Sequence, residues 1–173
     1  MIIAVYTFTI DIDPEFGGLQ QGWLPMLQGL REIFFRFKPW EHFSENEGID
    51  LNNLPSGETY LSRLEKGFEL QQTNQDIYQL AINTLARFIE QVLTRDARES
   101  FRYLLFWPLR LCPEMISLMS DRDPCALAIL AGYFKALTFF EASALVQSTG
   151  NKHLSLVHAI IPSKWQPVVV NLP

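Results

Sequence analysis

Cysteine and histidine are scarce in this 173-residue sequence, which has two cysteines and three histidines. Cys112 and Cys125 form no C-x-x-C pair and no evenly spaced set, so the sequence shows neither a disulfide framework nor a cysteine-rich metal site. His153 and His158 are five residues apart and therefore do not share a helix face, and His42 is remote in sequence. We expect the two C-terminal histidines at the surface or partly buried, with no bound metal and no cofactor. Reduced thiols favour an intracellular compartment.

Charged side chains are also few, since Lys, Arg, Asp and Glu make up 19% of the residues against about 25% in ordinary soluble domains. The formal net charge is −5, which disfavours direct nucleic-acid contact because phosphate binding requires clustered Lys and Arg. Residues 1–10 are apolar but lack the basic segment and small-residue cleavage site of a signal peptide. We therefore expect a nuclear or cytoplasmic protein that does not itself bind nucleic acid.

Catalytic motifs are missing from the sequence. It has no G-x-S-x-G turn, no phosphate-binding glycine loop and no G-x-G-x-x-G. Asp11 and Asp13 form a D-x-D pair that no glycine or distant glutamate completes into a calcium loop. Cys112 lies between leucine and proline without an adjacent cation, so a buried, inert thiol is expected. We expect no enzymatic activity and assign no catalytic residue.

Apolar surface is what the sequence has in excess, with 48% hydrophobic and 13% aromatic residues. A small, well-solvated monomer does not need this much. The surplus is compatible with the lining of a ligand cavity, with a self-association face, or with the contact surface inside a larger domain. Composition does not separate these three alternatives.

The longest apolar segment predicts a central helix at about residues 124–147. Asp123 is suited to cap this helix, and Pro124 to occupy its first position. Sixteen of the 21 residues that follow Cys125 are apolar, and they surround the helix axis. A helix of this kind is buried in a protein core or in a membrane. Because Lys135 interrupts the apolar run and no basic or aromatic flank brackets it, we expect a buried core helix and no membrane span.

Further helices are predicted where apolar residues recur at helical spacing or where proline and capping residues mark a start. Gly150 and Asn151 are expected to stop the central helix, and residues 162–173, with three prolines, to form an extended tail whose Val168–Val170 run packs back on the domain. No strand pair stands out, so we predict an all-α fold, a single helical domain over residues 1–173. The remaining predicted helices are 23–37, a segment capped by Ser56 or Thr59, 76–93, 97–106, 113–119 and 152–161. The predicted core face of 76–93 is Ile77, Leu80, Ala81, Leu85, Phe88, Ile89 and Val92.

Two segments carry a further pattern. Residues 23–34 are WLPMLQGLREIF, and residues 104–137 are LLFWPLRLCPEMISLMSDRDPCALAILAGYFKAL. In this order and spacing they resemble the C-terminal regulatory region of fungal zinc-cluster transcription factors related to the sterol uptake regulators. The family pattern is W-x-P-L-x-x-G, then W-P, P-x-F-x-x-L-L and P-x-A-L-x-I-L-A-x-Y. The resemblance covers about residues 22–173 and implies an all-helical effector domain.

In sterol-sensing relatives that domain holds a hydrophobic ligand and self-associates, while an N-terminal zinc cluster binds DNA. Two cysteines are too few for the six-cysteine binuclear cluster. The sequence also has Phe139-Phe140 and Ala142-Ser143 where the family often has paired tryptophans and a G-W, and Gly132 in place of a histidine. The ligand is therefore left open. The chain is interpreted as a truncated relative, a regulator without its DNA-binding part, or a fragment of a longer protein.

The resulting hypothesis is a transcription-regulatory effector module without its own DNA-binding domain, acting on sterol or secondary-metabolite genes. A sterol-like molecule beside the central helix would shift the population between two packings and so expose or hide a surface for a transcription-factor partner or a second copy. The alternative is a helical dimerisation or scaffold module with a packed core and no ligand. The Tyr133 hydroxyl is expected to be the polar tip of the ligand site, whose predicted lining is Trp23, Leu27, Leu30, Trp107, Leu130, Tyr133, Phe134 and Phe139.

Overall fold

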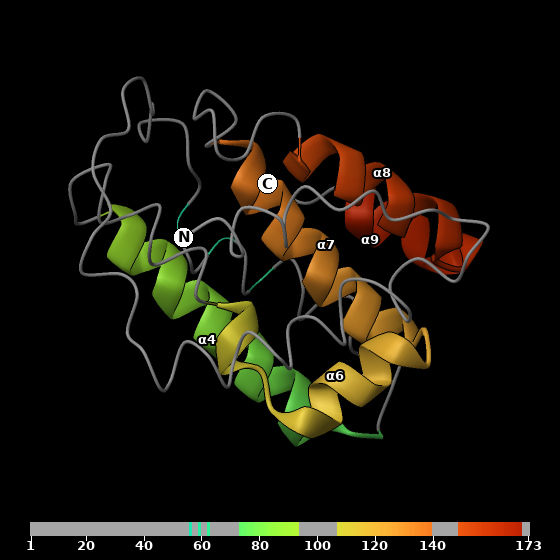
Figure 1. Cartoon of the computed structure of the whole chain (residues 1–173), viewed down its shortest axis with the longest axis horizontal. Coiled ribbons are helices and arrows are strands. Elements are labelled where there is room, and N and C mark those ends of the chain that lie inside the picture. The colour runs from blue at the N-terminus through green and yellow to red at the C-terminus, as the bar shows by residue number, and fades with distance from the viewer. Residues whose placement is uncertain are drawn as a thin grey trace, which may run out of the picture.

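The computed structural model describes residues 73–93, 107–139 and 149–170, together with Ser56, Thr59 and Ser62. In these ranges the protein is all-α, with five α-helices, two short 3-10 helices and no strand (Figure 1). The predicted fold class is thus confirmed for the described residues. The helices predicted at 23–37 and 97–106 lie outside them, and the single-domain organisation stays a prediction.

Helix α7, Pro124–Thr138, is the centre of the described core. The Asp123 carboxylate accepts a hydrogen bond of 3.0 Å from the backbone N–H of Ala126, and Pro124 occupies the first turn, as predicted. Every residue from 125 to 137 is buried except Lys135, which confirms a core helix covered on all sides. Within the described ranges, no helix combines the length and the hydropathy that crossing a membrane requires.

The C-terminal end of α7 comes earlier than predicted. The helix ends at Thr138, with Phe139 as its C-cap, whereas the apolar pattern placed the end near residue 147. The Thr138 hydroxyl donates to the Lys135 carbonyl at 2.7 Å, and the Phe139 N–H reaches the Ala136 carbonyl at 3.3 Å. The backbone bond from Phe139 to Ala136 tightens the last turn in the manner of a 3-10 helix, and the Thr138 hydroxyl occupies a further carbonyl of that turn. Residues 140–147 of the predicted helix lie outside the described residues.

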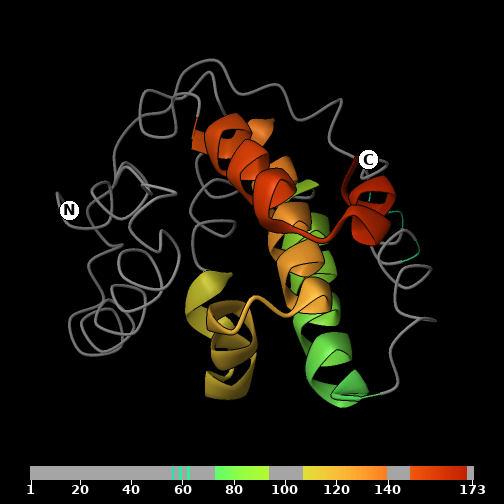
Figure 2. The ribbon, with the colours of Figure 1, turned by 90° about the vertical axis from the view of Figure 1, so that its right-hand side faces the viewer.

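Helix α8, Thr149–Ile160, packs along α7 (Figures 1 and 2). The structure corrects the prediction for Gly150, which does not stop the central helix but lies in the first turn of α8. A Cβ atom at this position would lie 2.8 Å from the Thr138 nitrogen, 3.0 Å from the Phe134 oxygen and 3.1 Å from the Leu137 carbonyl carbon. All three are backbone atoms, so only glycine permits this approach of the two helices.

Helix α4, Gln75–Leu93, agrees with the segment predicted at 76–93. Leu80 was predicted to face the core but is 59% exposed, whereas Tyr78 and Ile82 are buried. At about 100° per residue, Leu80 falls roughly opposite the stripe that faces the core. The buried residues of α4 follow one helical stripe and are Tyr78, Ala81, Ile82, Leu85, Ile89 and Val92.

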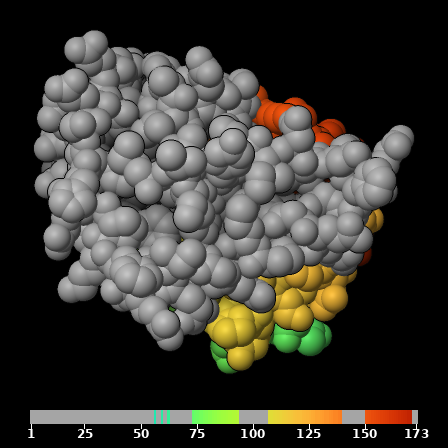
Figure 3. Space-filling view, viewed as in Figure 1, coloured from blue at the N-terminus to red at the C-terminus, as the bar shows by residue number. Residues whose placement is uncertain are grey.

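Helix α6, Pro113–Ser120, confirms the helix predicted at 113–119 and joins α7 through a tight connection. The Asp123 N–H bonds to the Leu118 carbonyl at 2.9 Å, and the Arg122 N–H to the Met119 carbonyl at 3.2 Å. With Arg122 at φ 58°, these bonds form a Schellman motif with a left-handed residue at C′. Asp123 therefore takes part both in the end of α6 and in the cap of α7. In the face shown in Figure 3, α4 and α6 reach the lower edge.

The predicted extended tail is wrong for the residues that are described. Residues 163–170 form the 3-10 helix η5, Ser163–Trp165, and helix α9, Gln166–Val170. Their prolines are compatible with helix because Pro162 is the N-cap of η5 and Pro167 lies in the first turn of α9. The predicted packing of the valine run holds in part, since Val169 is buried and Val168 partly buried, but Val170 is 65% exposed.

One isolated part of the N-terminal half is also described. The Ser56 hydroxyl oxygen accepts a hydrogen bond of 3.2 Å from the Thr59 backbone N–H, and Thr59 is already helical. Of the two predicted capping residues, Ser56 therefore has the geometry of an N-cap.

Candidate functional site

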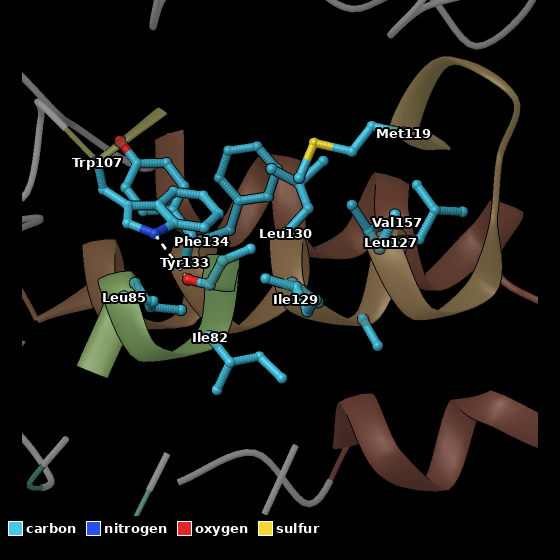
Figure 4. Close-up of a cluster of buried hydrophobic side chains, with 14 of the residues drawn as sticks. Ile82, Leu85, Trp107, Met119, Leu127, Ile129, Leu130, Tyr133, Phe134 and Val157 are labelled. Atoms are coloured by element: carbon cyan, nitrogen blue, oxygen red, sulfur yellow. Dashed lines mark hydrogen bonds between the residues drawn. The ribbon is translucent and has the colours of Figure 1, made fainter. Parts of the chain in front are cut away.

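Trp107 places a fully buried indole in the core directly before the 3-10 helix η4, Pro108–Arg110. Its ring N–H donates a hydrogen bond of 3.3 Å to the Ala81 carbonyl of α4, drawn as a dashed line in Figure 4. An unpaired buried donor costs ~1–3 kcal/mol, so this bond fixes the orientation of the indole. Trp107 thereby links η4 to α4.

Three further aromatic rings continue from this indole across the core, and we call the four together the aromatic ladder. The Trp107 ring stacks on Tyr133 of α7 with centroids 4.7 Å apart and an interplanar angle of 26°. Tyr133 adjoins Phe134 at 5.5 Å, and Phe134 stacks on His153 of α8 at 4.9 Å and 21°. Such pairs contribute ~0.5–1.5 kcal/mol each beyond the area that they bury. The aromatic ladder therefore connects η4, α7 and α8 through direct ring contacts.

The Tyr133 hydroxyl of α7, which the sequence analysis predicts as the polar tip of a ligand site, lies inside the core. The side chain is fully buried, and among the described residues nothing forms a hydrogen bond with its oxygen. Burial raises the pKa of this hydroxyl well above its usual 10, so the group stays neutral and is able both to donate and to accept. In Figure 4 the oxygen points away from α4. Phenylalanine would supply the same ring without a buried hydroxyl, so packing alone does not explain tyrosine here.

The structure brings together part of the predicted lining. Trp107, Tyr133 and Phe134 are consecutive members of the aromatic ladder, and Leu130 lies one turn before Phe134, fully buried on α7 (Figure 4). Phe139 is half-buried at the C-cap of α7, where it packs against the core. The other predicted lining residues fall outside the described ranges and are Trp23, Leu27 and Leu30.

His153 is a member of the aromatic ladder that the sequence analysis missed. It was expected at the surface or partly buried, but it is only 2% exposed, whereas His158 is half-buried as expected. The signal lies in its neighbours, because His153 follows the buried Gly150 by three residues and precedes the buried Val157 by four. That spacing defines one face of a helix, so His153 must share the core face of α8.

The N-terminal end of α7 holds two further buried groups. Burial, with a smaller contribution from Asp123, raises the pKa of the Cys125 thiol from 9.0 to about 12, against the opposing effect of Lys164. Burial and the same carboxylate also raise the pKa of the Tyr78 hydroxyl of α4. Both groups are neutral at physiological pH, so Cys125 is not an activated thiol.

Cys112 differs from its prediction as a buried thiol. It is half-buried, because it is the N-cap residue of α6 and precedes Pro113 at the start of that helix. Across the described ranges, no three His, Cys, Asp or Glu side chains gather as metal ligands would. The arrangement thus offers an apolar, aromatic environment with a buried hydroxyl as its chemical feature.

Comparisons with known proteins add no assignment to this geometry. The resemblance to fungal zinc-cluster factors therefore stays a prediction from the two sequence segments that carry it. No model of a known protein family matches the chain, and neither a curated protein nor a solved structure is significantly similar to it.

Proposed function

We propose that this chain is a transcription-regulatory effector module without a DNA-binding domain of its own, which senses a hydrophobic small molecule such as a sterol. It acts in the nucleus or cytoplasm on sterol or secondary-metabolite genes, through a transcription-factor partner or a second copy. The observation that carries the proposal is the buried, neutral Tyr133 hydroxyl in an otherwise apolar aromatic core. Small-molecule sites are usually lined by apolar and aromatic side chains with few polar groups.

The contacts of the aromatic ladder support a sensing role. A ligand that touches Tyr133 touches a ring stacked on Trp107 of η4 and adjoining Phe134, which stacks on His153 of α8. Gly150 brings the backbones of α7 and α8 into direct contact. Because closely packed elements leave no space between them, a displacement of α7 also displaces α8. The ligand favours one packing of these helices, and the exposed side of α8 changes its position as a partner surface.

Thermal unfolding of the purified chain against a panel of sterols and other neutral lipids tests this proposal. A ligand that binds only the native state at about 100 times its Kd adds ~2.7 kcal/mol, which raises the midpoint by roughly 5–10 °C for a chain of this size. Leu80→Gln is the matched control. It removes a 59% exposed leucine, so a shift caused by nonspecific adhesion of lipid to exposed apolar side chains should shrink, whereas a shift caused by binding in the core should stay. Unchanged midpoints with the whole panel at saturation contradict ligand sensing.

A helical dimerisation or scaffold module is the second candidate function. Two observations support it. Leu80 and Val170 are large apolar side chains that are 59% and 65% exposed, and α7 is buried by other parts of the chain without a ligand. In this case light scattering shows a dimer across the concentration range, and native mass spectrometry shows no bound small molecule. Leu80→Gln or Val170→Gln then weakens the dimer, whereas an effector module that binds ligand as a monomer is unaffected by either change.

A further inference from the structure

Of the stacked pair Trp107 and Tyr133, only Trp107 has a hydrogen-bond partner for its polar group among the described residues. The Trp107 N–H is paired with the Ala81 carbonyl at 3.3 Å, whereas no described residue pairs with the Tyr133 hydroxyl. Buried polar groups are paired in the great majority of cases, by protein, water or ligand. An external group that bonds to Tyr133 therefore gains a contact that the described core does not already supply.

The charge of the surrounding core limits what that group is. No Lys, Arg, Asp or Glu side chain is buried in the described ranges. The ionisable side chains that are buried there are tyrosines, Cys125 and His153. A carboxylate or an ammonium group beside Tyr133 would lose its hydration without meeting a Lys, Arg, Asp or Glu of opposite charge among these residues, which costs far more than burying a hydroxyl. His153 does not supply that charge next to Tyr133, because the ring that it stacks on is Phe134. A neutral hydroxyl or carbonyl group does not carry this desolvation cost. The Tyr133 phenol is able to donate a hydrogen bond to either group, and it is also able to accept one from a hydroxyl.

We infer that the Tyr133 hydroxyl anchors the polar group of a neutral hydrophobic alcohol or ketone, and that the site rejects carboxylates of the same skeleton. This inference rests on the proposed ligand-sensing function and adds the chemical class of the ligand and the residue that selects it. It makes Tyr133 a specificity-determining residue, while the rest of the aromatic ladder supplies apolar contact.

The first test is the stability of ligand-free Tyr133→Phe. Because the substitution removes a buried hydroxyl that no described residue pairs, the thermal midpoint should stay unchanged or rise. A fall in the midpoint means that the hydroxyl is bonded inside the chain, and this result overturns the inference. The variant keeps the ring that stacks on Trp107, so a folded protein is expected.

The second test compares three probes with one skeleton, 2-naphthol, naphthalene and 2-naphthoate, by equilibrium dialysis read from ligand absorbance. The native protein should bind 2-naphthol about tenfold or more tightly than naphthalene, with 2-naphthoate weakest. In Tyr133→Phe the preference should reverse, because the naphthol hydroxyl is then the group left unpaired. Tyr78→Phe is the matched control, since its hydroxyl lies near Asp123 at the other end of α7 and outside the aromatic ladder, and it should keep the native preference.

The outcomes separate this inference from the proposal on which it rests. Equal binding of 2-naphthol and naphthalene, tightest binding of 2-naphthoate, or an unchanged preference in Tyr133→Phe overturns the inference and leaves ligand sensing standing. Absence of binding by all three probes also overturns it. In that case the lipid panel decides whether the proposed function is lost as well, because a thermal shift there preserves ligand sensing through contacts other than the Tyr133 hydroxyl.

Discussion

Replacing Gly150 by alanine probes the closest contact between α7 and α8. The new Cβ would lie 2.8 Å from the Thr138 nitrogen and 3.0 Å from the Phe134 oxygen, both backbone atoms of a helix that is itself packed on all sides. Ordinary carbon contacts are about 3.5–4.0 Å, so α8 has to move outward by roughly half an ångström or more. Overpacking of a rigid contact costs up to ~3 kcal/mol, and the better helix propensity of alanine returns ~1 kcal/mol. We expect a net loss of ~1–2 kcal/mol.

Urea titration and thermal unfolding measure this loss, and the midpoint should fall by roughly 2–8 °C in a chain of this size. Ser155→Ala is the matched control, because it changes an exposed residue of the same helix and should stay within about 0.5 kcal/mol of the native protein. The sign is decisive. Gly→Ala in a helix without a close neighbour stabilises by ~0.4–1 kcal/mol, so a more stable Gly150→Ala refutes the close approach of α8 to α7.

Three further predictions concern the start of α7. Asp123→Ala removes the carboxylate that accepts from the Ala126 N–H and should lower the free energy of unfolding by ~1 kcal/mol in urea titration. Arg122→Gly should raise it by up to ~1 kcal/mol, because φ 58° places the arginine Cβ against backbone. The Cys125 thiol has a pKa of about 12 in the folded chain against 9.0 ordinarily, so the unfolded state loses its proton first. Stability should therefore fall as pH rises from about 9 to 12, as measured by urea midpoints, and less steeply in Cys125→Ala.

Each of these predictions has its own control. Asp121→Ala removes an exposed carboxylate from the same connection and should leave stability nearly unchanged, so an equal loss in both variants argues against a specific cap. Arg122→Ala removes the charge but keeps Cβ, and a gain as large as that of Arg122→Gly assigns the effect to charge. For the thiol, parallel pH curves for the native protein and Cys125→Ala contradict the shifted ionisation.

The start of the central helix is predictable from sequence because its causes are local. Asp123 and Pro124 each act within one turn, and the apolar residues that follow need no knowledge of their partners to indicate burial. The causes that end the helix are not visible in the local sequence. Residues 139–146 continue the apolar pattern without a helix breaker, so periodicity extends the helix past Thr138, where the structure ends it.

Glycine and proline account for two further differences. Gly150 is a conventional stop signal, but its missing side chain serves a helix–helix contact, and a single sequence does not show which neighbour approaches. Pro162 and Pro167 favour an extended tail when the helix boundaries are unknown. In the structure they lie at the N-cap of η5 and in the first turn of α9, where a helix does not use the backbone N–H that proline lacks. Leu80 follows the partly buried Ile77 by three residues, so local spacing favours the core face for it, whereas the buried stripe runs through Tyr78 and Ile82.

The candidate site was recognisable in part. Tyr133 and Phe134 on the central helix and Trp107 before Pro108 stand out as aromatic residues in the sequence, and the structure places them in contact. His153 gave no signal by itself, since a single histidine has no periodicity and the face of α8 that it shares is set by Gly150. That the Tyr133 hydroxyl lacks a described partner depends on every element around it, so no sequence pattern predicts it.

Amide hydrogen exchange along α7 tests most directly whether this helix is the core on which the aromatic ladder is built. Residues 125–137 are buried apart from Lys135, so their amides should open only on global unfolding and exchange more slowly than those of α9, whose Val170 is 65% exposed. We predict the slowest exchange in the chain over residues 128–137. Exchange there as fast as in residues 166–170 would contradict a buried α7, and with it the site and the function proposed around Tyr133.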